Sequence, residues 1–524
     1  MSDRLDLVSG LYFGRDDAEN DAVDGLLRTG FVTTSAYEEA LWGRKSLIVG
    51  RKGSGKSAIC MRLAMPEVSQ GEHLLITPDD TASAPLRGFE LADLTGAAAK
   101  SLIWRYVFAI HIARHLVDHH TRRSHGHREP KSVRRVRQFL RANGELADAR
   151  LPSRIATAAT GLRGSLRLEA FGLSLTADLN AASEGIRASA QLAIIERGVG
   201  AALAHLDCAG THRPVLLLVD KLEHIWSTEP DSKALITGLL VAAKHVATTY
   251  HRAARCVVFL RSDIYDSLSY SEADKFRSDE IRLDWSREQL VDLAVTRAAA
   301  SLGQHVTREF LWGTVFPPSV DGEPVVDYLF SRMLARPRDT IQFLNQCRDQ
   351  ARWAGHDRIT DQDVVNAAVE FSRWKTNDLA REYGSTLPFL ERVLAMFQNG
   401  ATVVTPATTA RHLDEFGESL HAQFPRYSAM LNPTGLLDVL FRVGFLGVRR
   451  GGDITYITNA ALPIQPHETE FHIHPCFRPA LTVADTVTTG YGYTPLQSGL
   501  VVGDISSGNA YQGNAGIWDL PDED

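Results

Sequence analysis

The chain has 524 residues, which is more than one ordinary domain holds and predicts two to four domains. A hydrophobic fraction of 44% and a charged fraction of 23% are typical of a protein that buries sizeable cores. The net charge of −7 is small for this length and argues against binding of polyanions over the whole surface. The sequence shows neither an apolar leader nor a run of about 18 apolar residues, so we expect a cytoplasmic protein without membrane contacts. The five scattered cysteines form no CxxC pair, so we expect reduced thiols (Cys60, Cys208, Cys256, Cys347, Cys476).

Residues 1–44 form a lead-in that begins acidic and continues with FVTTSAYEEALWGRK. Thr34 or Ser35 can cap a short helix through residues 38–41. Residues 45–80 then follow the pattern strand, glycine-rich turn, helix, strand (KSLIVG, KSAICMRLA, EHLLITPDD). This succession predicts a parallel α/β unit.

The turn after the first strand fits the pattern GxxxxGK[ST]. Such a loop wraps its backbone N–H groups around a β-phosphate at a helix N-terminus, the lysine reaches the β- and γ-phosphates, and the hydroxyl ligates Mg²⁺. Because the match lies between an apolar strand and a helix, it favours an ATP and Mg²⁺ site over a chance glycine turn. The predicted nucleotide-binding residues here are Gly50, Arg51, Lys52, Gly53, Ser54, Gly55, Lys56, Ser57 and Ala58.

Residues 81–212 interrupt the α/β pattern and are predicted to be an insertion within the core, which spans 45–285. Two apolar helices are expected, over 94–120 and 182–206. Between them, GSLRLEAFGLSLTADL (164–179) alternates apolar and polar residues, which predicts a β-hairpin around Gly172.

Two features of this insertion have functional alternatives. Segment 114–141 has nine Lys or Arg residues against two acids, so it is either a solvated helix face or a contact for nucleic acid phosphates. His111, His115 and His119 share one helical face and offer metal-ligand spacing. Because no Cys or Glu partner accompanies them in the sequence, a structural role is favoured.

The core resumes with the buried strand RPVLLLVD (213–220). Its last residue, Asp220, is the candidate for the carboxylate that holds the Mg²⁺ water shell, with a helix N-cap as the alternative. Glu223 is the best available base for activating water, and His224 follows it. The position directly after Asp220, where a carboxylate could activate water, is occupied by Lys221. Binding of ATP is therefore better supported than hydrolysis.

The next strand, RCVVFLRSD (255–263), ends in Arg261, Ser262 and Asp263, and Arg261 can meet a γ-phosphate there. Lys275 and Arg277 precede the last core strand, DEIRLDW (279–285). They are candidates for an arginine finger that reaches the nucleotide of a neighbouring subunit, or simply a solvated basic turn.

Residues 286–383 are predicted to form a helical lid, with Thr360 capping one of its helices. The segment ARPRD (335–339) opens a long helix at Pro337, and Arg336 or Arg338 can contact a phosphate.

Residues 384–482 combine short helices with a hairpin that turns at Gly451–Gly452 and are predicted to be a winged-helix-like domain. Arg442, Arg449 and Arg450 flank the predicted wing and are candidate DNA contacts, although a packing role is favoured. His472 and His474 are two residues apart, which places them on one face of a predicted strand, and they are interpreted as structural. The tail, 483–524, is rich in Gly, Ser and Thr and is predicted to be flexible.

With these motifs in this order, the chain resembles the AAA+/STAND class of P-loop ATPases, near its origin-recognition-like branch, and more narrowly a little-characterised bacterial P-loop ATPase family. The likeness runs from residue 12 to 480 and is carried by FGRDDAEND, GRKGSGKSAI, VLLLVDKLEHIW, VVFLRSDIYDSL, DKFRSDEIRLDW and ARPRDTIQFLNQC. It implies an α/β P-loop core with a parallel 5-1-4-3-2 sheet, a helical lid and a C-terminal winged-helix domain.

The resemblance also implies residue roles and a mode of action. In STAND proteins the strand-end arginine, here Arg261, senses the γ-phosphate, and a Gly-x-Pro of the lid touches the nucleotide. Ala335-Arg336-Pro337 keeps only the proline of that motif. The class works by nucleotide-gated oligomerisation, often in bacterial signalling or defence against phage, which implies a homo-oligomer. The sequence shows no second catalytic constellation, so we expect the effector to be a separate protein or the tail.

Three functions therefore stand as hypotheses. The first is an ATP-binding switch that hydrolyses slowly if at all. The second is an origin-recognition-like protein that binds DNA through its winged helix and basic insertion. The third is a catalytically silent scaffold that ATP stabilises.

Overall fold

The computed structural model describes residues 7–69, 72–78, 86, 88–123, 129–146, 151–164, 166–172, 182–208, 214–226, 230–268, 274–384, 386–457 and 462–482. All of them belong to the unit Met1–Asp485. The tail predicted to be flexible lies outside the described residues.

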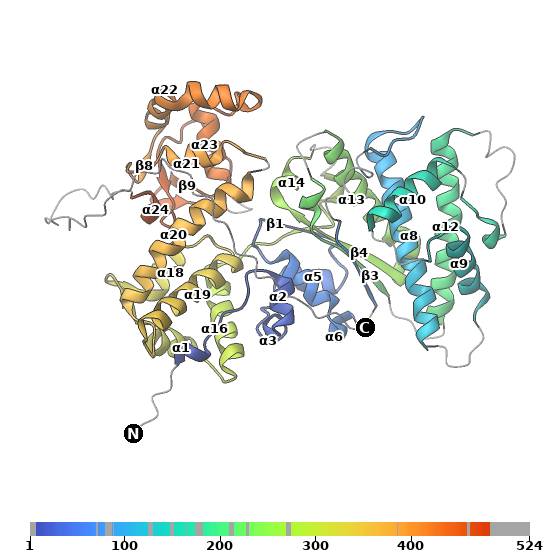
Figure 1. Cartoon of the computed structure of the whole chain (residues 1–524), viewed down its shortest axis with the longest axis horizontal. Coiled ribbons are helices and arrows are strands. Elements are labelled where there is room, and N and C mark those ends of the chain that lie inside the picture. Colours follow the sequence, from blue (N-terminus) through green and yellow to red (C-terminus); the bar gives the residue numbers. More distant parts are fainter. Residues whose placement is uncertain are drawn as a thin grey trace, which may run out of the picture. The chain divides into compact units, whose positions relative to one another are not determined.

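A five-stranded parallel sheet forms the centre of the N-terminal half (Figure 1). The three central strands are apolar runs that are almost entirely buried, since a parallel sheet covered on both faces excludes water from both sides, whereas the two edge strands are only partly buried. The order β2-β3-β4-β1-β5 is the predicted 5-1-4-3-2 order, which is thereby confirmed. The strands are β1 (Leu47–Gly50), β2 (His73–Ile76), β3 (Val215–Val219), β4 (Ala254–Arg261) and β5 (Glu280–Arg282).

Long helices between β2 and β4 share one hydrophobic core with the sheet. Helix α8 packs closely against α13 at Gly238, because this glycine has no side chain to hold the two helices apart. A Cβ there would lie 2.8 Å from the backbone nitrogen of Ser101. The described α-helices between β1 and β5 are α5 (Lys56–Ala64), α6 (Pro66–Ser69), α8 (Gly96–Arg123), α9 (Lys131–Ala142), α10 (Leu151–Arg163), α12 (Glu184–Cys208), α13 (Pro230–Tyr250) and α14 (Ser262–Asp266).

The β-hairpin predicted for residues 164–179 is wrong for the part that is described. Residues 166–172 form no strand and contain a 3-10 turn, Glu169–Phe171, which ends at Gly172 with φ of 77°. Phe171 packs on the ring of Phe139 in α9 and lies where a side chain at Gly198 of α12 would clash. This packing overrides the alternating pattern. The remainder of the predicted hairpin lies outside the described residues.

The lid consists mainly of helices, and two of them begin at the residues predicted to start or cap them. Pro337 is the first residue of its helix, and Thr360 caps the next one through the backbone N–H of Asp363. The lid elements are α16 (Arg287–Leu302), α17 (Arg308–Phe310), the π-helical turn η5 (Leu311–Val315), the two-stranded β6 (Ser319–Val320) and β7 (Glu323–Pro324), α18 (Val325–Ser331), α19 (Pro337–Ala354) and α20 (Asp361–Tyr383).

The last described region combines helices with a sheet of order β10-β9-β11-β8, as the winged-helix prediction requires. Strands β9 and β10 pair antiparallel across the predicted Gly451–Gly452 turn. One hydrophobic core joins this region to the lid. Its elements are α21 (Leu390–Ala395), β8 (Val403–Val404), α22 (Pro406–Gln423), α23 (Pro433–Arg442), β9 (Leu446–Arg450), β10 (Asp453–Thr455), β11 (Phe471–Ile473) and α24 (Arg478–Leu481).

The N-terminal lead-in divides between the two cores. Helix α1 (Leu7–Gly10) contributes to the core of the lid, whereas the helix that Thr34 caps, α4 (Ser35–Leu41), packs beside β1 and α5. Between them lie α2 (Ala18–Val23) and α3 (Leu26–Thr29).

Two expectations about the chain as a whole are tested by the described residues. Cys60, Cys256, Cys347 and Cys476 are buried and free of disulfides, as expected for reduced thiols. None of the described helices combines the length and the apolar character needed to cross a membrane.

Candidate nucleotide site

The glycine-rich loop lies between β1 and α5 at the carboxyl edge of the sheet. Gly53 and Gly55 have φ of 78° and 96°, a conformation that disfavours other residues. A Cβ at Gly50 would lie 2.5 Å from the hydroxyl oxygen of Ser54, so the first glycine is needed for the tight turn. The loop therefore has the backbone that a phosphate cradle requires.

Lys56 is buried and turned inward onto its own loop. Its Nζ donates to the carbonyl oxygens of Gly50 and Arg51, each at 2.9 Å. Burial lowers the pKa of Lys56 to about 8, although Asp220 and Glu223 act in the opposite direction. A bound phosphate would give this ammonium a stronger partner than the two carbonyls.

Ser57 and Asp220 meet at the position expected for Mg²⁺. Asp220 follows β3, is 5% exposed, and accepts a hydrogen bond from the Ser57 side chain. Burial raises the pKa of Asp220, against the effect of this hydrogen bond. A hydroxyl and a carboxylate at the strand edge form the donor set that P-loop proteins offer to Mg²⁺, so these two residues fit the ion.

The residue after Asp220 is turned away from the site. Lys221 has φ of 61°, and its Nζ pairs with Glu19 of α2 at 2.7 Å. Glu223 lies in a 3-10 turn (Leu222–His224), is exposed, and lines the same pocket as Lys56. The carboxylate available for activating water is thus Glu223, three residues after Asp220, and not the residue directly after it.

Arg261 also lines this pocket, where β4 ends. A bidentate contact holds it to Asp263, with Nε to Oδ1 at 3.0 Å and Nη2 to Oδ2 at 2.7 Å. The next residue, Ser262, starts α14. Since β1 and β4 are neighbours with Gly50 opposite Arg261, the guanidinium lies within reach of the phosphate loop.

The start of lid helix α19 contacts the loop directly. Arg338 donates its backbone N–H to the Gly53 carbonyl oxygen at 3.3 Å, and Pro337 and Arg338 line the pocket. Arg336 is buried instead among Asp339 and Glu382 and donates through Nη1 to the Lys52 carbonyl oxygen at 2.7 Å. Of the two predicted phosphate-contacting arginines, only Arg338 lies in the pocket.

Arg51 joins the loop to the winged-helix region. Its Nη1 donates to the Ile457 carbonyl oxygen at 3.3 Å, and its Nη2 donates to that of Arg442 at 3.4 Å. A Cβ at Gly444 would lie 3.1 Å from Nη2, so that glycine leaves room for the guanidinium. Sequence patterns gave no sign that this loop residue faces the C-terminal region.

The walls of the pocket come from segments that no sequence motif links to the phosphate loop. The lead-in, the segment after β5 and two lid helices converge there, and Trp285 donates its indole N–H to the Ser54 carbonyl oxygen at 2.8 Å. Asp21 of the lead-in and Arg297 of α16 form a buried pair at 2.6 Å. The wall residues missed from the sequence include Arg15, Asp16, Leu27, Phe31, Val32, Thr34, Trp285, Leu293, Arg297 and Ile341. The apolar Phe31-Val32 pair between two short helices was the one local signal for them.

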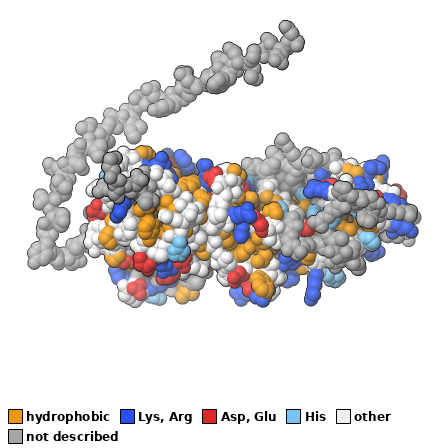
Figure 2. Space-filling model, turned by 90° about the horizontal axis from the view of Figure 1, so that it is seen from below, with side chains coloured by type: hydrophobic (Ala, Val, Ile, Leu, Met, Phe, Trp, Pro, Cys, Tyr) orange, Lys and Arg blue, Asp and Glu red, His pale blue; other side chains and the backbone are white. Residues whose placement is uncertain are grey.

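The remaining basic candidates lie apart from this pocket. Lys275 and Arg277 are exposed near the turn Asp274–Phe276 and do not line it. Each of the three candidate arginines of the winged-helix region pairs with a carboxylate. Arg442 pairs with Asp438 at 2.9 Å, Arg449 with Glu470 at 2.6 Å and Arg450 with Glu468 at 2.6 Å. Figure 2, which views the molecule from below, shows both basic and acidic side chains on that face.

His472 and His474 lie on β11 and have protein partners. His472 pairs with Glu470 at 2.8 Å, and the Nδ1 of His474 accepts from the backbone N–H of Cys476 at 3.1 Å. Burial lowers the pKa of His474 to about 3. The contacts are those of structural residues.

The strand order, the phosphate loop after β1 and the buried carboxylate after β3 together define an AAA+-type P-loop ATPase fold. Residues 288–380, which span the lid helices, match the family described as a FunZ-associated C-terminal helical domain.

Two curated proteins are similar in sequence. The chain is 24% identical over 489 residues to the putative transposon gamma-delta 80.3 kDa protein of Escherichia coli (strain K12), over 89% of this chain and 66% of that protein. The chain thus spans just under two thirds of that relative's length. It is also 24% identical over 160 residues to Allergen Alt a 2 of Alternaria alternata, over 30% of this chain and 84% of that protein.

Among solved structures, two similar ones are Cdc6p from Pyrobaculum aerophilum and the Aeropyrum pernix ORC1 protein in complex with DNA. The first has a TM-score of 0.31 and 10% identity over 86% of this chain and 93% of the other. The second has a TM-score of 0.36 and 13% identity over 88% and 91%.

Proposed function

We propose that the chain is an ATP-binding molecular switch in which Mg-ATP changes the packing of the lid and winged-helix regions and thereby the oligomeric state. Lys56 and the loop backbone bind the phosphates, and Ser57 and Asp220 hold Mg²⁺. Arg261 senses the γ-phosphate after leaving Asp263, and Pro337 and Arg338 contact the nucleotide from the lid.

The observation that carries this proposal is the attachment of the phosphate loop to both following regions. Arg51, Lys52 and Gly53 are consecutive, and each hydrogen-bonds outside the core, to the winged-helix region or to α19. Within the loop, Lys56 also donates to the Arg51 carbonyl oxygen. A phosphate that draws Lys56 away from this carbonyl alters the residue that holds the winged-helix region. Nucleotide occupancy and domain packing are therefore coupled.

Slow hydrolysis follows from the surroundings of Asp220. Lys221 occupies the next position and is bound to Glu19, which leaves the exposed Glu223 as the base. A carboxylate on a short solvated turn is less precisely held than one on a strand end, and general-base catalysis depends on such positioning. A long-lived ATP state suits a switch.

The resemblance to STAND proteins extends the proposal to bacterial signalling or defence against phage. In such an assembly, the exposed Lys275 and Arg277 are available to the nucleotide of a neighbouring copy, and the output belongs to a separate effector protein.

The test is the solution mass of the full chain with and without Mg-ATP, measured by light scattering after size exclusion. We expect the wild type to change mass with ATP and Lys56→Ala to remain in the nucleotide-free state. Lys233→Ala is the matched control, since it removes an exposed lysine of α13. If the wild type binds ATP and neither its mass nor the hydrogen exchange of α19 and β9 changes, the switch is refuted.

A further inference from the structure

A second cluster of chemically active side chains lies at the opposite edge of the sheet from the nucleotide site. We propose that Glu72, His115 and His119 form a binding site for a divalent transition-metal ion of the zinc type, which fastens the helical insertion to the edge strand of the core. This inference is independent of the proposed switch, because none of the three residues lines the nucleotide pocket.

The fold brings these residues together from two distant segments. His115 and His119 are four residues apart in α8, so their imidazoles project from one helix face. Glu72 immediately precedes β2, and its carbonyl oxygen accepts from the Leu216 N–H at 2.9 Å, which fixes its backbone against β3. Because the strands are parallel, the amino end of β2 lies on the edge opposite the phosphate loop.

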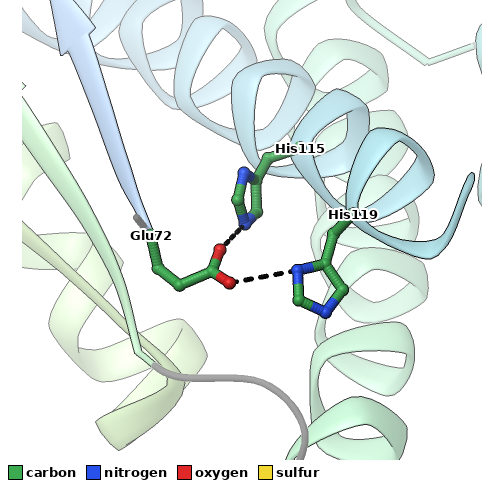
Figure 3. Close-up of side chains that lie close together, drawn as sticks. All are labelled: Glu72, His115 and His119. Carbon is green, nitrogen blue, oxygen red and sulfur yellow. Dashed lines mark ion pairs between the residues drawn. The ribbon is translucent and has the colours of Figure 1, made fainter. Parts of the chain in front are cut away.

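The side chains converge on one point (Figure 3). His119 Nδ1 lies 3.0 Å from Glu72 Oε1, and His115 Nε2 contacts the other carboxylate oxygen. One ligand atom from each residue can be chosen so that all three lie within 4.8 Å of one another. The side chains are 4%, 13% and 6% exposed for Glu72, His115 and His119 respectively. The cluster is therefore enclosed and nearly preformed.

The donor set suits zinc. Two neutral imidazoles and one carboxylate are a recurrent ligand set for Zn²⁺, and a water completes four-coordination. Zinc–nitrogen bonds of about 2.0–2.1 Å in a tetrahedron separate ligand atoms by about 3.3 Å. Small side-chain rotations thus convert the present contacts into a coordination shell. Metal ligation requires neutral imidazoles and an ionised carboxylate, so binding of the ion releases any proton that these groups hold.

The competing explanation is a hydrogen-bonded Glu–His–His cluster that binds no metal. Both explanations account for the close contacts, and they differ in whether an ion is bound at these atoms. The difference is measurable without ATP, so failure of the metal site leaves the switch untouched.

The experiment uses the full chain with its affinity tag removed, first stripped with chelator and then titrated with Co²⁺ and Zn²⁺. We expect one equivalent of Co²⁺ to give visible absorption bands of a four-coordinate site, and Zn²⁺ to displace it. Glu72→Gln and His119→Ala should weaken metal binding beyond the roughly 10- to 100-fold that loss of an outer-shell partner causes. His120→Ala is the control, because it removes a neighbouring histidine of the same helix that is outside the cluster.

Two results would overturn the site. One is that the stripped wild type gives no Co²⁺ absorption bands and binds less than one Zn²⁺ per chain in the titration. The other is metal binding that Glu72→Gln and His119→Ala leave at the wild-type level. The wild-type titration tests the site even if a variant fails to fold, which circular dichroism would detect.

Discussion

A buried ion network behind the phosphate loop gives the most quantitative prediction. Arg336 lies between Asp339 and Glu382, and its Nη1 is 3.2 Å from a Glu382 carboxylate oxygen. Lys375 pairs with the other oxygen of Asp339 at 2.5 Å. Side chains of these four residues are at most 5% exposed. The same Arg336 also holds the Lys52 carbonyl oxygen of the phosphate loop.

Replacing Glu382 by Gln removes one negative charge from this network while keeping its shape. Burial alone would raise the pKa of Glu382, but Arg336 and Lys375 overcome that effect and lower it to about 2. Against an ordinary value of 4.5, this corresponds to roughly 3 kcal/mol contributed by the ionised carboxylate at pH 7. The contribution is complete above pH 4.5 and is lost as the pH falls toward 2. At pH 3.5 about 2 kcal/mol remains.

Hydrogen exchange of α19 and α20 measures this local free energy without assuming that so large a chain unfolds in one step. At pH 7, Glu382→Gln should speed exchange in both helices roughly 100-fold, and the ratio to wild type should shrink below pH 4.5. Glu370→Gln is the control, since Glu370 lies on the same helix in an exposed pair with Arg373. Equal exchange in the two variants, or a ratio that does not depend on pH, would refute the electrostatic argument.

Further outcomes follow from the nucleotide pocket and the winged-helix region. Because Lys56 has a pKa of about 8 and a bound phosphate favours its ammonium form, ATP binding at pH 8 should take up about half a proton and far less at pH 6; calorimetry in buffers of different ionisation enthalpy measures this, and equal uptake at both pH values would contradict it. Glu223→Gln should lower phosphate release while leaving ATP affinity within about 3-fold, as followed by single-turnover hydrolysis. Arg51→Ala should change the ATP dissociation constant by about 5-fold, because two long hydrogen bonds to the winged-helix region are worth about 1 kcal/mol; an unchanged constant argues against coupling. Since Arg449 and Arg450 are already paired with carboxylates, replacing both by alanine should not alter retention on DNA at low salt, and a clear loss would revive the DNA-binding hypothesis.

The elements that the sequence predicted are those whose signals are local. The core strands follow from apolar runs bounded by turn residues, and helix starts follow from Thr34, Pro337 and Thr360, because capping involves residues only three apart. The order of the strands came from a family resemblance, since apolar runs do not specify their neighbours. The failed hairpin illustrates the opposite case, where packing of Phe171 on two distant helices decides the conformation.

The candidate site divides in the same way. The phosphate loop and Asp220 are visible because strand ends and a contiguous motif fix their positions. The attachment of Arg51 to Ile457 crosses 406 residues of sequence, and only the folded chain brings them together. The histidines of α8 were noticed by their spacing, but their carboxylate partner, Glu72, lies 43 residues before His115 on another element. Pairings over such separations depend on tertiary packing, which a single sequence does not encode in any local pattern.

The shared core of the lid and winged-helix regions limits which movements the proposed ATP switch can produce. Because one hydrophobic core joins them, separating the two costs far more than breaking the few hydrogen bonds that tie them to the phosphate loop. A ligand shifts an equilibrium only by its difference in affinity for the two states, so the weaker contacts are where nucleotide binding acts. The two regions should therefore move together as one body relative to the sheet. Linkage makes the effect reciprocal, and an assembly that holds this body away from the loop must also tighten ATP binding.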